Sequence, residues 1–279
     1  MKVCSVNGFV LFFSLLSFKT YSQNNLDTLG ILNIIKNAYE ICENDPEKTI
    51  ELGKKALDAS LKKKYLKGEV SAYNVIGVGY DVSAKYDSSI SYYFKGLKLS
   101  EKLSDNSLKA SIYNNIGLTY WNLSEYKNAI KYYYKALSIF KNSKDLKGIA
   151  KTHNNLGLLY EDMLDSKSAI QQYKESISNY SQLNDTNGLS VAYLNLGTSY
   201  NSLNNFIESE YYYKKSFSLK KENDYYGKSI VLLNWAQVKN ALFQTDTAIA
   251  LIQQSINDKE KINDTNGLIS AYNVMANTY

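Results

Sequence analysis

Apolar residues recur at helical spacing in paired segments along most of the chain. Residues 108–140 hold the clearest pair: Ile112, Ile116 and Tyr120 lie on one face of the first segment, and Ile130 and Leu137 lie on one face of the second. Intervals of three and four residues are typical of amphipathic helices. The pattern therefore predicts two helices joined by a short polar turn.

This helix pair repeats about every 40 residues. A small residue in the first helix serves as the reference position of each repeat: Gly77, Gly117, Gly157, Gly197 and, after a slip of one residue, Ala236 and Ala276. Self-similarity at such a period is the signature of a solenoid, in which each hairpin buries its apolar faces only by stacking on its neighbours. We therefore predict an all-helical solenoid.

Glycine in the middle of a helix costs about 1 kcal/mol relative to alanine, so its recurrence needs a reason. We expect the second helix of each repeat to approach the reference glycine closely. A second glycine series lies nine residues earlier and is interpreted as marking the breaks between repeats. It comprises Gly68, Gly148, Gly188, Gly227 and Gly267.

The repeat carries a recognisable consensus. It follows the pattern Leu-Gly-x-x-Tyr, then Tyr, then Ala-Ile-x-x-Tyr-x-Lys-Ala-Leu. The matching residues are Ile116, Gly117, Tyr120, Tyr126, Ala129, Ile130, Tyr133, Lys135, Ala136 and Leu137. The chain therefore resembles the tetratricopeptide repeat family over roughly residues 31–279, in a variety longer than the usual 34 residues. The resemblance implies a right-handed superhelical solenoid of helix hairpins. Such arrays also resemble the N-terminal sensor regions of bacterial envelope signalling proteins.

The pattern divides the chain into segments. They are residues 1–22, an atypical first repeat over 29–64, regular repeats over 66–105, 106–145, 146–185 and 186–224, a degenerate sixth repeat over 225–263, and the first helix of an incomplete seventh over 264–279. The last segment has no second helix to cover it. We expect the natural polypeptide to continue, the alternative being a terminal helix that packs back on the sixth repeat.

Two substitutions mark the junction of the fifth and sixth repeats. Glu210 stands where other repeats have isoleucine, and Lys239 stands where they have tyrosine. We expect a local distortion there, or repacking around Ile207.

The first 22 residues do not belong to the repeats. Lys2 precedes an apolar run, and Thr20 and Ser22 occupy the positions that a signal peptidase requires. The run is too short to span a bilayer, which takes about 20 residues. We predict a signal peptide cleaved after Ser22, export to the periplasm or cell envelope, and no other membrane span in residues 1–279; an uncleaved anchor is the alternative.

Composition narrows the function further. The formal charge is +5, and all 32 basic residues are lysine. This weak bias gives no basis for a membrane prediction, and we expect no nucleic-acid binding by this region. His153 occupies the position of a packing tyrosine, and Cys42 is the only cysteine after residue 22, so neither a zinc site nor a disulfide is expected. No catalytic constellation is visible, which predicts no enzyme, no metal and no cofactor.

The resemblance implies that first helices line a concave groove. Its candidate ligand-binding residues are Asn74, Asp81, Asn114, Leu118, Trp121, Lys151, Asn154, Leu158, Glu161 and Asn201. The asparagines would bond an extended peptide backbone, and Trp121 would be an exposed anchor. The alternative is that the asparagines bond neighbouring helices. The groove lacks the basic and amide set of the family's carboxylate-binding members.

These observations favour an exported interaction scaffold whose groove holds a peptide or protein partner. The alternative is a structural or assembly protein that pairs with another chain through its open repeat face.

Overall fold

A computed structural model describes residues 27–103 and 106–278. Within them the chain forms thirteen α-helices and no strand, which confirms the all-helical prediction. The helices are α1 (Thr28–Ile41), α2 (Pro46–Lys63), α3 (Leu66–Val82), α4 (Tyr86–Ser100), α5 (Ser107–Asn122), α6 (Tyr126–Asn142), α7 (Leu146–Asp162), α8 (Ser166–Gln182), α9 (Thr186–Ser202), α10 (Phe206–Ser218), α11 (Tyr225–Ala241), α12 (Thr245–Lys261) and α13 (Thr265–Ala276).

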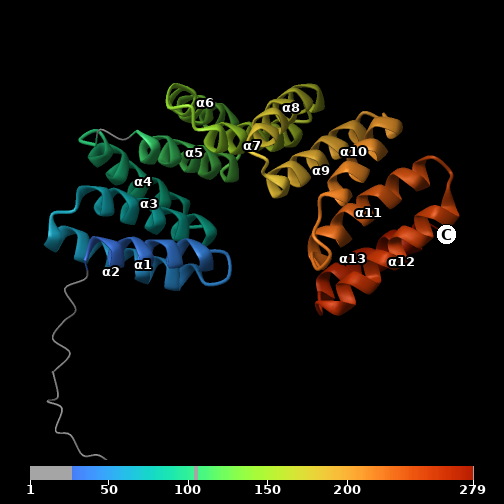
Figure 1. The fold of residues 1–279 in the computed structure, drawn as a ribbon, viewed down its shortest axis with the longest axis horizontal. Coiled ribbons are helices and arrows are strands. Elements are labelled where there is room, and N and C mark those ends of the chain that lie inside the picture. The colour runs from blue at the N-terminus through green and yellow to red at the C-terminus, as the bar shows by residue number, and fades with distance from the viewer. Residues whose placement is uncertain (1–26, 104–105, 279) are drawn as a thin grey trace, which may run out of the picture.

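The helices stack as consecutive pairs in a curved array. Each helix packs on the next, and the odd-numbered first helices also contact one another from α1 to α13. Among the described residues, no two even-numbered second helices approach within 8 Å between Cα atoms. Because only the first helices stay close together, the array bends with these helices on its inner side. Figure 1 shows the resulting arch, with α6 and α8 on its outer side and α5 and α7 nearer the inner side.

The reference glycines lie under tyrosine rings. A Cβ atom built on Gly157 would lie 2.4 Å from Cε1 of Tyr173, and one on Gly117 would lie 2.8 Å from Cδ1 of Tyr133. Both tyrosines are fully buried. The second helix therefore reaches the backbone of the first, as the glycine spacing predicts.

The second glycine series has a different role from the one predicted. Gly148 lies inside the first turn of α7, where its N–H donates to Asp145 Oδ1 at 2.9 Å. A Cβ atom there would meet the Phe140 ring at 2.4 Å. No described glycine has a positive φ. Left-handed residues between the helices are instead Lys64, Ala84, Ser124, Lys144, Leu164, Asn184, Asn204, Phe243 and Asn263. Interpreting these glycines as breaks was therefore wrong; they allow close packing.

An ion pair joins the fifth and sixth repeats. Lys239 Nζ lies 2.7 Å from Glu210 Oε1, and Lys214 Nζ lies 2.8 Å from the same oxygen. Burial acts to raise the pKa of Glu210, but hydrogen bonds from the two lysines outweigh it and hold the pKa below its usual value. Ile207 stays 79% exposed, so the expected repacking around it was wrong. Lys239, in the place of tyrosine, is therefore paired with Glu210, in the place of isoleucine.

His153 also belongs to a matched pair. Its Nδ1 lies 2.8 Å from Oε1 of Gln172, and both side chains are buried. Burial lowers the pKa of His153, partly offset by the bond to Gln172. In the preceding repeat the same two positions hold Tyr113 and Tyr132, whose ring centroids are 5.9 Å apart. His153 therefore takes the place of a packing aromatic.

The described residues contain neither a membrane-spanning helix nor a metal-binding cluster. Within the described residues, no helix combines the length and apolar character needed to cross a bilayer. The same residues contain no cluster of three or more His, Cys, Asp or Glu side chains arranged to hold a metal ion. The predicted signal peptide, residues 1–22, lies outside the described part of the chain.

Enlarging a reference glycine should destabilise the array unless its tyrosine shrinks. We expect Gly157→Leu to lower the free energy of unfolding by about 1–3 kcal/mol, because overpacking forces the helices apart. The matched control is Gly157→Ala with Tyr173→Ile, which recreates the pair Ala236 and Ile252 of the sixth repeat. Urea unfolding followed by circular dichroism measures both. A double variant no more stable than Gly157→Ala alone would contradict the proposed contact.

Breaking the Glu210–Lys239 pair should lower the free energy of unfolding more than replacing both residues does. Glu210→Ile leaves Lys239 buried without a carboxylate, which we expect to cost up to about 3 kcal/mol. Adding Lys239→Tyr restores the arrangement of the regular repeats and should recover most of that loss. Because the pKa of Glu210 is lowered on folding, its contribution is complete above the ordinary glutamate pKa and is lost as pH falls through the folded value. Thermal unfolding between pH 7 and pH 3 tests this, and equal acid sensitivity of wild type and double variant would count against it.

Candidate functional site

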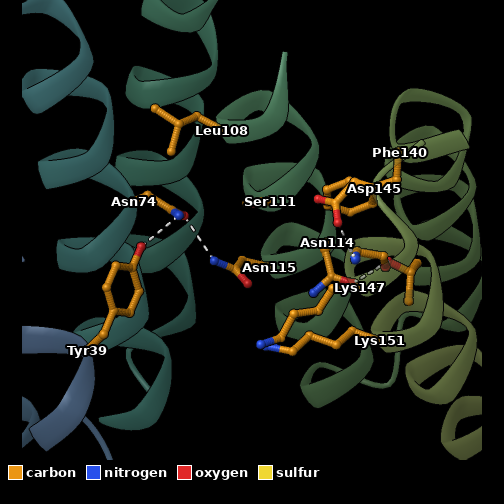
Figure 2. Close-up of a pocket in the computed structure, with 12 residues that line it drawn as sticks. Tyr39, Asn74, Leu108, Ser111, Asn114, Asn115, Phe140, Asp145, Lys147 and Lys151 are labelled. Atoms are coloured by element: carbon orange, nitrogen blue, oxygen red, sulfur yellow. Dashed lines mark hydrogen bonds between the residues drawn. The ribbon is translucent and has the colours of Figure 1, made fainter. Parts of the chain in front are cut away.

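A pocket opens on the inner side of the array, between the first helices of the second, third and fourth repeats (Figure 2). Its volume is about 410 Å³. It is lined by Tyr39, Asn74, Leu108, Ser111, Asn114, Asn115, Phe140, Asp145, Lys147, Gly148, Lys151 and Thr152. Three of the predicted groove residues therefore meet here, namely Asn74, Asn114 and Lys151.

Two lysines give the pocket its charge. Lys147 and Lys151 lie one turn apart on α7, and Figure 2 shows both side chains extending in the same direction into the pocket. Both are exposed, and neither forms an ion pair within the described part of the chain. Asp145 is the acidic residue of the lining, and its Oδ1 accepts the N–H of Gly148. The pocket thus carries two ammonium groups against one carboxylate that caps a helix.

The predicted groove residues Asn74, Asn114 and Asn154 occupy the same position in successive repeats and form an asparagine ladder, which connects the repeats through its oxygen atoms. Asn74 Oδ1 accepts from Asn115 Nδ2 at 3.0 Å, and Asn114 Oδ1 accepts from Asn155 Nδ2 at 3.3 Å. Asn154 Oδ1 accepts in the same way from the asparagine 41 residues later. The alternative interpretation, bonds between neighbouring helices, therefore describes the oxygens.

The nitrogen atoms of the ladder behave differently along it. Asn74 is buried and donates its Nδ2 to the Tyr39 hydroxyl at 2.8 Å. Asn114 and Asn154 are half-buried, and within residues 27–103 and 106–278 no bond from their Nδ2 atoms is found. Asn114 therefore presents a free N–H donor to the pocket, beside the two lysines.

Three other predicted residues form hydrogen bonds to the next repeat. Each lies four positions after the reference glycine of its own repeat. Asp81 accepts from Thr119 Oγ1 at 2.6 Å, and burial raises its pKa while that bond acts to lower it. Glu161 accepts from the hydroxyl at the equivalent position, Ser199. Trp121 is half-buried and donates its Nε1 to an acidic side chain of α7 at 2.5 Å. Trp121 therefore packs between repeats, and the description of it as an exposed anchor was wrong.

The last three predicted residues lie away from the pocket lining. Leu118 and Asn201 are half-buried. Leu158 packs against the cluster formed by Ala169, Tyr173 and Leu196. The structure thus separates the ten predicted residues into a few that line one pocket and several that hold neighbouring repeats together.

Lys147 is the residue that sequence reasoning missed. It lies four residues before Lys151, and positions four apart on a helix share one face. That spacing was visible in the sequence, but the predicted groove positions began one turn later. With Lys147 included, Asn114, Lys147 and Lys151 bring two amines and an amide to one pocket, at positions other than those of the family's carboxylate-binding set.

Comparison with known proteins agrees with this architecture. A family model described as "Tetratricopeptide repeat" matches residues 108–182 and 148–222. Residues 108–222 therefore contain tetratricopeptide repeats. A search of curated proteins gives no significant match.

Several solved structures share the fold at low sequence identity. BtubC (BKLC) from P. vanneervenii superposes with a TM-score of 0.71 at 18% identity, covering 78% of this chain and 92% of that one. A signal transduction ATPase with a tetratricopeptide repeat sensor from Pyrococcus horikoshii gives 0.70 at 15% identity over 91% of this chain and 41% of that one. The apo quorum sensor NprR from B. thuringiensis gives 0.66 at 18% identity over 88% and 69%.

Proposed function

We propose that this tetratricopeptide repeat protein is a non-catalytic scaffold that holds an extended peptide or protein segment in its inner groove. The observation that carries the proposal is a set of donors at one pocket that have no partner among residues 27–103 and 106–278. They are the amines of Lys147 and Lys151 and the Nδ2 of Asn114. A carboxylate of the partner is the group that best matches them. It accepts several hydrogen bonds and neutralises the two ammonium charges.

The rest of the pocket suits a peptide. Leu108 and Phe140 supply apolar surface next to the donors, and Ser111 adds a hydroxyl. Amide side chains such as Asn114 bond a peptide backbone whatever its sequence, because every residue offers a carbonyl oxygen. Affinity from the backbone and selectivity from the carboxylate would then combine in one site.

The fold neighbours support the proposal by analogy. NprR is also solved in complex with its cognate peptide NprX, and this chain superposes on that complex with a TM-score of 0.57 at 17% identity over 85% of its length. The archaeal ATPase carries its repeats as a sensor. We therefore propose that the partner is a peptide or an extended protein segment, and that capture serves a sensing role.

A second candidate function rests on α13. Ile269 and Tyr272 are 57% and 54% exposed on this helix. Adjacent apolar side chains on one helix are a potential contact for another chain. Assembly through this surface is the alternative to peptide capture, and sedimentation of Ile269→Lys beside wild type distinguishes them, since only assembly requires a larger wild-type species.

Removing the two pocket lysines should abolish selectivity for acidic ligands. We expect wild type, panned against a display library of random unstructured peptides, to enrich sequences that carry Asp, Glu or a free C-terminal carboxylate. Lys147→Ala with Lys151→Ala should weaken binding of an enriched peptide about tenfold or more, since a charged hydrogen bond contributes about 1.5–3 kcal/mol. Lys127→Ala with Lys131→Ala is the matched control, an exposed pair one turn apart on α6. Equal loss in both variants, or enrichment of basic peptides, would refute the proposal.

We also propose that the chain is exported, on the basis of the signal-like pattern in residues 1–22. Expressed with its own N-terminus in a Gram-negative host, the protein should be recovered from the envelope fraction starting at Gln23. Intact-mass spectrometry gives the answer directly. A protein that retains Met1 and stays in the cytoplasm would show that no export signal operates.

A further inference from the structure

A second hollow lies farther along the inner side, between α11 and α13. Its volume is about 390 Å³. It is lined by Tyr226, Ile230, Leu233, Asn234, Gln237, Lys259, Asp264, Asn266, Gly267, Ser270 and Val274. Counted from the reference residues, most of these positions are equivalent to those of the first pocket. The repeat architecture therefore builds one kind of hollow twice, and the side chains differ.

The charged positions of the first pocket are neutral in the second. Asn266 and Ser270 on α13 stand where α7 carries Lys147 and Lys151. Both residues on α13 are exposed. The lysine of the second lining, Lys259, is buried and its Nζ lies 3.1 Å from Oδ2 of Asp264. That pair leaves the second hollow without an unpaired charge among its lining residues.

The polar positions of the preceding helix become apolar. Ile230 stands where α5 carries Ser111, and Leu233 stands where it carries Asn114. Val274 adds a third aliphatic side chain. Tyr226, at the start of α11, is 61% exposed at the edge of the hollow. An aliphatic floor beside an exposed aromatic ring favours an apolar side chain over an acidic one.

We propose that the groove reads its partner at two chemically different subsites. The subsite at Lys147 and Lys151 takes an acidic group, and the subsite at Ile230 and Leu233 takes an aliphatic or aromatic side chain. The occupant is one extended peptide segment that carries both. This inference rests on the proposed function and adds the selectivity rule for the same groove.

Continuity of the inner helices connects the two subsites. The first helices contact one another in the order α5, α7, α9, α11 and α13, so both hollows open on the same side of one uninterrupted row. Charge complementarity orients the ligand, because its acidic group meets opposite charge only at the basic subsite. Multipoint binding of this kind gains affinity from the second contact without a second loss of translational freedom.

The test uses the full chain and the same random peptide library. We expect peptides enriched by wild type to carry an acidic group and, at a fixed separation, an apolar residue. Asn266→Lys with Ser270→Lys places exposed lysines at the second subsite, as at the first. This variant should lower the affinity of a wild-type-enriched peptide about tenfold and enrich peptides with acidic groups at both positions.

Two further variants separate binding from folding. Tyr226→Ser changes an exposed ring and should weaken the same peptide about threefold with an unchanged melting temperature. Ile230→Ser should weaken it further. Replacing the apolar residue of the peptide by serine should cancel the effect of both variants.

The outcomes are distinct. The second subsite is overturned if wild type enriches peptides for an acidic group alone. It is also overturned if the apolar preference survives all three variants. Either result leaves the proposed peptide capture standing. Absence of any peptide enrichment by wild type overturns both. A paired acidic and apolar motif whose apolar half responds to α11 and α13 supports the two-subsite groove.

Discussion

The contact between a tyrosine ring and the backbone of a reference glycine sets the geometry of each repeat. Gly157 and Tyr173 illustrate it: the ring lies where a Cβ atom would be, and the two helices meet at that point. Each first helix, packed closely on its own second helix, also contacts the next first helix. The inner row of helices, and with it the groove, is a consequence of this packing.

Positions that touch in this array vary together. Glycine with tyrosine becomes alanine with isoleucine at Ala236 and Ile252. A tyrosine pair becomes the hydrogen-bonded pair of His153 and Gln172, and isoleucine with tyrosine becomes Glu210 with Lys239. Each exchange keeps either the volume or the polar satisfaction of the contact, as a close-packed interior requires. Departures from the consensus therefore mark conserved contacts rather than weak repeats.

The fold was predictable from the sequence because period and apolar spacing act through every repeat at once. The side-chain roles were less predictable, because they depend on partners about 40 residues away. Asp81 was visible as an inner-side carboxylate, yet its partner Thr119 is found only when two repeats are superposed. Trp121 shows the same difficulty, since its register holds charged residues elsewhere and its indole is nonetheless partly buried between helices. The pocket itself needed Lys147, one turn before the positions that the family resemblance indicated.

The asparagine ladder links the stability of the array to its binding surface. Asn114 uses its oxygen to accept from the following repeat, while its nitrogen remains available on the inner side. A ligand that accepts from this nitrogen also fixes the amide plane, and thereby the geometry of the bond between repeats. Stacking in a solenoid is cooperative between nearest neighbours. Under the proposed function, a ligand bound in one pocket would therefore stiffen the adjacent repeats, and binding at one subsite would be coupled to the repeats on either side.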